Sequence, residues 1–386
     1  MRKKVRMTAF FLALLFVLNG CWNYRSLNDI ALVAGMAVDM DPESKEYKLA
    51  FEIVDLNGDI ASSGPKAKLI ESRGKTIFDA VRNAKKRLEK RLFFGNAQVL
   101  VMSEEIAKDG HIMHLIDWFL RDAELRETAH VIVSQEKTAA EILNVKGVNN
   151  AVVAYEIENI VTDDKTATSS TSDLMLYQIY NTLHAEGLSL TLPAFHKVIN
   201  DGEPACEVNG SAVFKEQILL GYLTPEESKY LLFVLDEVKG GILTLSAKGH
   251  EQDDVSLEIS QNKTKQSFSV EDGKLKVTVD TETNVYLAEI ASEFDALDEE
   301  KVTSLEAAAG AKLKQGIEDM IRKVQSEYRS DIFGFGNTIH KKNSKLWSSI
   351  SGYWEDLFPT LEVTVHSKIS IVNSAYSKST MREGGK

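Results

Sequence analysis

The N-terminal segment most constrains what this chain can fold into, because it sets residues apart from the folded body. Residues 2–6 carry four positive charges, and the run 9–18 is apolar and uncharged. A basic start, a short apolar core and a small residue before a cut are typical of a secretory signal. The apolar run is shorter than the roughly 20 residues needed to cross a hydrocarbon core. We therefore predict that residues 1–20 are a signal peptide, removed after Gly20.

The end of this signal, Leu18-Asn19-Gly20-Cys21, resembles the bacterial lipobox, although Asn19 is unusual there. The resemblance implies that Cys21 becomes the new N-terminus and carries a covalent lipid, as an N-palmitoyl and S-diacylglycerol cysteine. Each buried methylene is worth about 0.8 kcal/mol, so several acyl chains hold a protein where one would not. We expect a protein anchored at Cys21 outside the cell membrane rather than spanning it. An ordinary cleavage site with a chance cysteine is the alternative.

Composition indicates a folded body with no basic footprint. The 386 residues are 44% hydrophobic and 26% charged, which is typical of a soluble chain with room for two or three domains. The net charge is −12, and losing the four basic signal residues makes it −16, which argues against nucleic acid as a partner. Beyond Cys21 only Cys206 remains, so no internal disulfide can form. We interpret Cys206 as a small buried hydrophobe.

Strand and helix patterns alternate through the first half of the chain, which predicts mixed α/β layers. Strands are expected at 31–38, 47–53, 98–102 and 130–133. Helices are expected at 76–92, 112–119, 147–160 and 173–185. The segments 57–68 and 162–172 are polar and predict exposed loops.

The second half becomes rich in strand patterns and ends in a strand–helix–helix–strand order. Asn209-Gly210 and Asp272-Gly273 each predict a tight hairpin turn, and Thr224-Pro225 predicts the start of a short helix. Helices are expected at 298–328 and 339–353, and a final strand at 361–371. We expect an α+β fold of about three domains, each with a sheet and packed helices. The expected units are 21–187 (N-terminal α/β), 188–250 (β-rich middle), 251–376 (C-terminal α/β) and 377–386 (flexible tail).

Several strings in the right order resemble the Ger(x)C family, the lipoprotein C subunits of spore nutrient-germinant receptors. The matching strings are CWNYRSLNDIA from Cys21, with Gly35 and Asp39; FGN from Phe94; WFLRDAELR from Trp118; GSAVFK from Gly210; GYLT from Gly221; DIFGFG from Asp331; Leu346-Trp347; and Trp354 to Phe358-Pro359. Asn96 stands where the family has His. The resemblance implies three mixed α/β domains and assembly with the two integral-membrane A and B subunits. It also implies a place on the outer face of the spore inner membrane, and no catalysis.

Candidate chemistry outside the lipid site is sparse. The sequence holds no hydrolase, metalloprotease or phosphate-loop motif, and no Cys pair. His111, His114 and Asp117 share a three-residue spacing on a predicted helix and could hold a metal, but such a trio arises easily by chance. Gly334 and Gly336 form a Gly-x-Gly that we interpret as a turn between helices. No catalytic, cofactor-binding or metal-binding residue is assigned.

Three further groups have a structural interpretation at this point. Asp163 and Asp164 lie in a polar loop, where nothing would raise the pKa of a carboxyl for acid–base work. Four aromatics are expected to pack in a core: Trp347, Tyr353, Trp354 and Phe358. Six cations share one face of the predicted helix 76–92: Arg82, Lys85, Lys86, Arg87, Lys90 and Arg91. They could touch anionic lipid headgroups, although a solvated helix face is the favoured interpretation.

The leading hypothesis is therefore a lipid-anchored receptor subunit required for nutrient-triggered spore germination. The alternative is a substrate-binding lipoprotein of a transporter, which needs two similar lobes around a cleft. A secreted enzyme ranks third, because the sequence shows no conjunction of catalytic groups.

Overall fold

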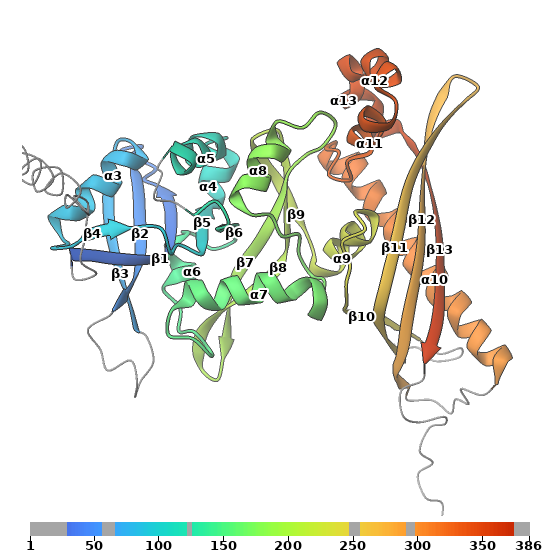
Figure 1. Ribbon diagram of the computed structural model, residues 1–386, viewed down its shortest axis with the longest axis horizontal. Helices are drawn as coiled ribbons and strands as arrows, with labels where there is room; N and C mark the ends of the chain where they lie inside the picture. Colours follow the sequence, from blue (N-terminus) through green and yellow to red (C-terminus); the bar gives the residue numbers. More distant parts are fainter. Residues whose placement is uncertain (1–28, 56–65, 122–125, 247–254, 291–297, 374–386) are drawn as a thin grey trace, which may run out of the picture.

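The structure is a computed structural model that describes residues 29–55, 66–121, 126–246, 255–290 and 298–373. These residues form one sheet of nine strands and one of four, with helices packed against both (Figure 1). Of the described residues, 37% are helical and 38% are in strands. The predicted mixture of helices and sheets is confirmed.

The first sheet is parallel at its centre and antiparallel at both ends. Its order is β3-β2-β1-β5-β6-β7-β8-β9, with β4 paired to β1. The parallel strands β1, β5 and β6 are buried on both faces, which explains their nearly continuous apolar sequence. The strand bounds are β1 Ile30–Met40, β2 Tyr47–Asp55, β3 Lys66–Gly74, β4 Arg91–Phe93, β5 Val99–Ser103, β6 His130–Ser134, β7 Thr191–Asn200, β8 Glu203–Lys215 and β9 Ile218–Leu223.

Helices cover both faces of this sheet and make it a three-layer unit. One core forms under α3, α4, α5 and α8, and a second forms under α6 and α7. The helix bounds are α3 Ile77–Asn83, α4 Glu104–Lys108, α5 Ile112–Arg121, α6 Ala140–Leu143, α7 Val153–Ala167 and α8 Leu176–Leu183. No helix of the described residues has both the length and the apolar character needed to cross a bilayer.

The second sheet has the order β10-β11-β12-β13, and the long helix α10 packs along it (Figure 1). Asp272 and Gly273 take positive φ angles of 50° and 75° and turn β11 into β12, so this predicted hairpin is confirmed. The Thr224 cap is confirmed as well: its hydroxyl accepts from the backbone N–H of Glu227, whose carboxylate accepts from the backbone N–H of Thr224. The bounds are α9 Pro225–Val234, β10 Ile242–Leu245, β11 Val255–Glu271, β12 Lys274–Ile290, α10 Glu299–Lys323, α11 Phe335–Lys342, α12 Ser344–Ile350, α13 Trp354–Leu357 and β13 Glu362–Asn373.

The helix predicted at 76–92 is shorter than expected. It ends at Asn83, continues as a single 3-10 turn η2 over Ala84–Lys86, and gives way to β4. Arg91–Phe93 pair in parallel with the start of β1. Backbone pairing to a central strand therefore overrides the helical spacing of apolar residues here. Residues 66–68 of the predicted loop 57–68 begin strand β3, and its residues 57–65 lie outside the described residues.

Two predicted loops and turns are also wrong. Residues 162–167 belong to α7, and the side chains of residues 169–172 are buried rather than exposed. Asn209-Gly210 lies inside β8, where the β7–β8 register shifts as in a β-bulge. Gly210 has φ +81°, and a Cβ there would lie 1.9 Å from the carbonyl oxygen of Leu223. Gly210 is therefore required by the backbone geometry, but it marks a β-bulge and not the predicted hairpin turn.

The described part of the middle segment, residues 188–246, does not form a separate sheet. Strands β7 to β9 extend the first sheet and β10 joins the second, so 188–250 is divided between two sheets instead of forming a third. Helix 339–353 starts earlier than expected, at Phe335, and is interrupted at Asn343, whose side chain caps α12. The domain boundaries stay a prediction, and residues 1–28 and 374–386 lie outside the described residues.

Candidate functional site

The two sheets meet at a junction, where side chains and backbone groups from both halves of the chain contact one another. Three strips of contact form this junction. The first joins residues 186–189, after α8, to residues 331–337, before and within α11. The second joins β8 and β9 to the end of α10. The third joins the C-terminal end of α7 to residues 237–241, after α9. Val213 and Leu223 of the first sheet belong to the hydrophobic core of the second, so the two halves share apolar packing.

In the first strip two backbones touch directly. A Cβ on Gly187 would lie 2.5 Å from the carbonyl carbon of Gly336, and a Cβ on Gly336 would lie 2.8 Å from the Cα of Gly187. The backbone N–H of Asn337 donates to the carbonyl of Gly187 at 2.8 Å. The indole N–H of Trp347 also donates to the carboxylate of Glu186. Gly336 is therefore required by this contact, and Gly334, with φ +68°, begins α11 as the predicted turn between helices.

Asp331 holds this strip together from inside. Its carboxylate accepts from the backbone N–H groups of Phe335 (3.2 Å) and Gly336 (2.8 Å), which are free donors at the start of α11. Its carbonyl accepts from the N–H of Ser189 at 2.8 Å. Burial raises the pKa of Asp331 to about 7, in opposition to the backbone donors, which lower it. The side chain thus positions the helix that closes the junction.

The second strip rests on the π-helical turn Val324–Tyr328. The ring of Tyr328 lies against Gly221, where a Cβ would meet its Cε1 at 2.8 Å, and its hydroxyl donates to the carbonyl of Tyr222 at 2.9 Å. Next to it, the hydroxyl of Ser330 donates to the carbonyl of Phe214 at 2.6 Å. These two bonds satisfy backbone carbonyl groups of β9, the edge strand of the first sheet, and of its neighbour β8 with hydroxyl groups from the second half.

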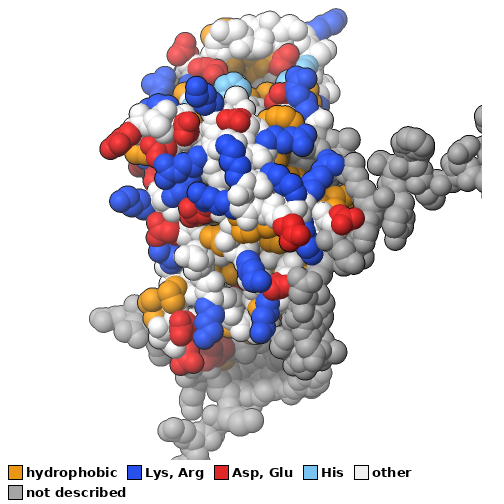
Figure 2. All heavy atoms as spheres, turned by 90° about the vertical axis from the view of Figure 1, so that its left-hand side faces the viewer, with side chains coloured by type: hydrophobic (Ala, Val, Ile, Leu, Met, Phe, Trp, Pro, Cys, Tyr) orange, Lys and Arg blue, Asp and Glu red, His pale blue; other side chains and the backbone are white. Residues whose placement is uncertain are grey.

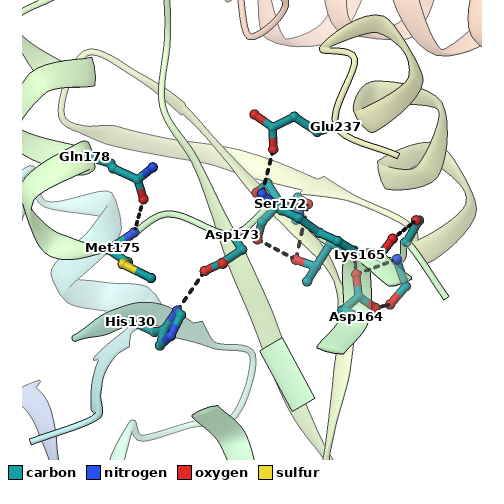
Figure 3. A network of polar contacts seen from close by, with 12 residues as sticks. His130, Asp164, Lys165, Ser172, Asp173, Met175, Gln178 and Glu237 are labelled. Carbon is teal, nitrogen blue, oxygen red and sulfur yellow. Dashed lines mark hydrogen bonds and ion pairs between the residues drawn. The ribbon is translucent and has the colours of Figure 1, made fainter. Parts of the chain in front are cut away.

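The third strip is built around the segment that sequence reasoning takes for a loop (Figure 3). The carboxylate of Asp164 accepts from the backbone N–H groups of Ser170 and Thr171, at 2.8 and 3.0 Å. At the same end of α7, Lys165 pairs with Glu237 of the other half at 2.8 Å. This burial of Asp164 corrects the expectation of an exposed carboxylate, because the turn after α7 folds back over it.

Figure 3 also shows how the segment continues toward the first sheet. Asp173 points at the ring of His130 on β6, with 2.7 Å between Oδ1 and Nδ1. Two residues on, the side-chain oxygen of Gln178 accepts from the backbone N–H of Met175 at 2.8 Å. The segment is therefore fixed at both ends, to β6 and to residue 237.

Two pockets flank the junction. One, of about 510 Å³, lies beside the third strip, between α7, β8, α9, β10 and α10. Lys229 lines it, donates to the carbonyl of Ile242 at 2.8 Å and has its pKa lowered by burial. Glu226 lines it too and accepts from the hydroxyl of Tyr230 at 2.7 Å. Charged groups beside an apolar wall, in a volume of this size, are typical of small-molecule sites.

The other pocket, of about 460 Å³, lies beside the first strip and is more polar. Arg329, Lys215 and Glu355 lie on its wall, and Lys215 and Glu355 pair with each other at 2.9 Å. Both pockets are built from residues of both halves, so any change in the packing of the junction would alter them.

The other buried carboxylates bind backbone N–H groups. Asp39 accepts from Ala139 and Ala140 at the start of α6, and Glu52 from Val153 and Ala154 at the start of α7. Burial raises the pKa of both, that of Glu52 to about 7. An ionised carboxylate is stabilised at a helix N-terminus, and these two hold helices onto the first sheet.

His111, His114 and Asp117 do not form a metal site. Nδ1 of His111 lies 3.2 Å from the hydroxyl of Tyr47, and the carboxylate of Asp117 pairs with Nε of Arg121 at 2.7 Å. The rings of His111 and His114 are 5.7 Å apart. Within the described ranges, no three His, Cys, Asp or Glu side chains gather as a metal ion would need.

The remaining sequence candidates fall in three places. Cys206 is buried, and burial raises the pKa of its thiol to about 12, as the small-hydrophobe interpretation requires. Trp347, Trp354 and Phe358 are buried in the second core, but Tyr353 is 51% exposed, so its assignment to a core is wrong. Cys21 lies outside the described residues.

Comparison with known proteins identifies the family. Residues 23–197 match the model for the spore germination protein N-terminal domain, and residues 209–375 match the C-terminal model for spore germination B3/GerAC-like proteins. The chain belongs to the Ger(x)C family. The border between the two models falls near the β7–β8 hairpin, whereas the first sheet continues to β9.

Ger(x)C relatives align with this chain nearly end to end. The spore germination protein KC of Bacillus subtilis (strain 168) is 22% identical, over 96% of each chain. The spore germination protein B3 of the same organism is 22% identical, over 93% of this chain and 95% of its own. The crystal structure of the GerBC protein superposes with a TM-score of 0.56 at 19% identity, covering 88% of this chain and 97% of that one. That likeness shows a shared fold.

Several of the sequence strings that resemble the Ger(x)C family form structural contacts in this fold. Asp39, at the end of the first string, caps α6, and the DIFGFG string supplies Asp331, Gly334 and Gly336 of the junction. Trp354 and Phe358 pack in the second core beside it. Sequence reasoning missed Glu186 and Gly187, which meet Trp347 and Asn337 across the junction, because those two residues carry no local pattern.

Proposed function

We propose that this chain is the lipid-anchored C subunit of a spore nutrient-germinant receptor and is required for nutrient-triggered germination. The observation that carries the proposal is the match of both family models, in order, over nearly the whole chain. Relatives of full length are named as spore germination proteins. The partners we propose are the integral-membrane A and B subunits, and the place is the outer face of the spore inner membrane, through a lipid on Cys21.

The role we propose is assembly rather than catalysis. Asp39, Glu52 and Asp331 are the described carboxyls whose burial raises the pKa, and all three bind backbone N–H groups at helix starts. Groups engaged in this way support the fold and its junction. The alternative, a transporter's substrate-binding lipoprotein, calls for two similar lobes, and sheets of nine and four strands are unlike.

The two cysteines of the chain provide a matched test. Cys21→Ala removes the proposed lipid site, and Cys206→Ala changes the other, buried thiol. Germination on single nutrients and the amount of protein in spore membrane fractions are measured for both variants. We expect a high-salt wash, which screens electrostatic binding, to release the Cys21→Ala protein from spore membranes and to leave the Cys206→Ala protein bound. Cys21→Ala should also lose the nutrient response, and Cys206→Ala should keep it.

Two results would count against the proposal. Membrane association of the Cys21→Ala protein that withstands the high-salt wash as well as that of the parent would exclude lipid anchoring as the means of attachment. Spores that lack the whole gene and still germinate at the normal rate on every nutrient tested would exclude the required receptor role, and a nutrient uptake assay would then take up the transporter alternative.

A further inference from the structure

One end of the first sheet carries a basic patch, which we define as Arg82, Lys85, Lys86, Arg87, Lys90 and Arg91. These cations were expected on one helix face. Instead they are spread over the end of α3, the turn η2 and the start of β4. Residues 82–91 contain a single acidic side chain, Glu89, in a chain whose net charge is −12. Figure 2 views this end of the molecule and shows lysine and arginine side chains across it.

Among the described residues, no carboxylate forms an ion pair with five of the patch cations, Arg82, Lys85, Lys86, Arg87 and Lys90. The guanidinium of Arg82 lies 4.8 Å from the ring centre of Phe78, and Arg87 donates to the carbonyl of Glu71 at 2.8 Å. Lys85 donates to the carbonyl of Glu89. Within the ranges that the structure describes, the side-chain ammonium groups of Lys86 and Lys90 form neither an ion pair nor a hydrogen bond. Their ammonium groups can therefore bind anions from outside.

Beside these cations lies an apolar hollow of about 300 Å³. Val81, Leu92 and Phe94 form its wall together with Phe78, which is 49% exposed, and four patch cations also line it: Arg82, Lys85, Lys90 and Arg91. An aromatic ring between lysine and arginine side chains suits the headgroup level of a bilayer, where rings bury an apolar body and cations reach the phosphates. A phosphate-binding site alone would not require the exposed ring.

The basic patch also lies close to Ile30, where the first strand of the fold begins. β1 begins at Ile30, and Ile30 is the register partner of Arg91 in the parallel β1–β4 pair. Cys21 precedes Ile30 by nine residues, so a fully extended chain allows at most about 30 Å between them. A lipid on Cys21 would keep the patch within that distance of the membrane. This step rests on the proposed anchor.

We propose that the basic patch docks on the surface of an anionic phospholipid membrane and sets the orientation of the anchored protein. The chain has a net charge of −12, so electrostatic attraction to such a surface favours the end that carries the basic patch. A cationic patch and an acyl anchor act together, because each alone gives weaker and more reversible attachment. Each Lys or Arg near an anionic surface strengthens partitioning about fivefold.

The test separates the patch from the lipid and from net charge. The mature chain, from residue 21 onward and carrying Cys21→Ala, is mixed with vesicles of phosphatidylcholine, with and without phosphatidylglycerol, and the bound fraction is measured by flotation. One variant adds Lys85→Gln, Lys86→Gln and Lys90→Gln. The matched control adds Lys263→Gln, Lys265→Gln and Lys345→Gln, three exposed lysines of the second half, and so has the same net charge. Circular dichroism checks that all three proteins are folded.

We expect the patch variant to bind phosphatidylglycerol vesicles about a hundredfold less than the parent, and the control to bind nearly as the parent does. Binding of the parent should also fall with added salt. Equal binding of patch variant and parent would overturn the proposal and leave the patch to an acidic protein partner. An equal loss in the control would overturn it too, since net charge alone would then explain binding. The vesicle assay uses neither lipid attachment nor germination, so its result is independent of the proposed receptor role.

Discussion

Replacing Asp331 with Asn should change how the stability of the chain depends on pH. Burial raises the pKa of Asp331 to about 7, while an Asp in the unfolded chain titrates near 3.9. A carboxyl whose pKa is raised on folding stabilises the native state fully below the unfolded pKa, and that contribution is lost as pH rises through the folded pKa. Three pH units at about 1.4 kcal/mol each give a loss of about 4 kcal/mol between pH 4 and pH 7. The Asn variant has no proton to lose.

Urea unfolding at half-unit steps from pH 4 to pH 8, followed by tryptophan fluorescence, measures this difference. Trp354 lines the same pocket as Asp331, so its emission reports on the junction. The free energy of unfolding of the parent, minus that of Asp331→Asn, should fall as pH rises toward 7 and then level off. Glu52→Gln, at the start of α7, should show the same trend, because burial raises the pKa of Glu52 to about 7 as well. Differences that do not change with pH would refute the reasoning.

Three further outcomes follow from the packing. Gly187→Ala should lower the melting temperature by clearly more than Gly202→Ala. Both glycines have a positive φ, but only at Gly187 would a Cβ meet another backbone segment, that of Gly336. Equal losses would mean that the φ angle alone matters. Thr224→Ala should cost about 1 kcal/mol in denaturant unfolding, because it removes a helix cap, and an unchanged midpoint would contradict this. Cys206 should react with a thiol reagent only after unfolding, because it is buried and its thiol pKa is raised to about 12; fast native labelling would argue against this.

The parts of the fold that could be predicted are those with a strong local signal. Apolar runs of the central strands, the Asp272-Gly273 turn and the Thr224 cap each specify their own backbone. The long helix expected at 298–328 is observed as α10 followed by a π-helical turn. In each case the residues that decide the structure are neighbours in sequence.

The errors arise where distant residues decide. Arg91–Phe93 leave the helical pattern because β1 offers them backbone partners. The Ser- and Thr-rich segment after α7 is buried because Asp164 satisfies its N–H groups. Asn209-Gly210 lies at a bulge of β8, and the carbonyl oxygen of Leu223, a residue of β9, leaves no room for a side chain at Gly210. None of these partners can be identified from one sequence without contact information.

Of the two sides of the junction, only the one formed by residues 331–336 could be predicted from the sequence. The string from Asp331 to Gly336 stood out, both as a resemblance and as a Gly-x-Gly, and it forms half of the first strip of the junction. Its partners at 186–189 follow a helix without any marked motif. Contacts across such a sequence separation depend on how two sheets are placed, and local propensity does not determine that placement.

The junction and the basic patch together would determine how the protein stands on a membrane. The patch lies at one end of the longest axis and the second sheet at the other (Figure 1). Docking at the patch would therefore hold the second sheet away from the bilayer, at a distance that a rigid junction would keep constant. A patch variant should then affect attachment and orientation while the two pockets stay intact. A Gly187 variant should loosen the pockets while attachment is kept. A partner that binds the second sheet would distinguish these two defects. Only the Gly187 variant would change the surface that this partner contacts.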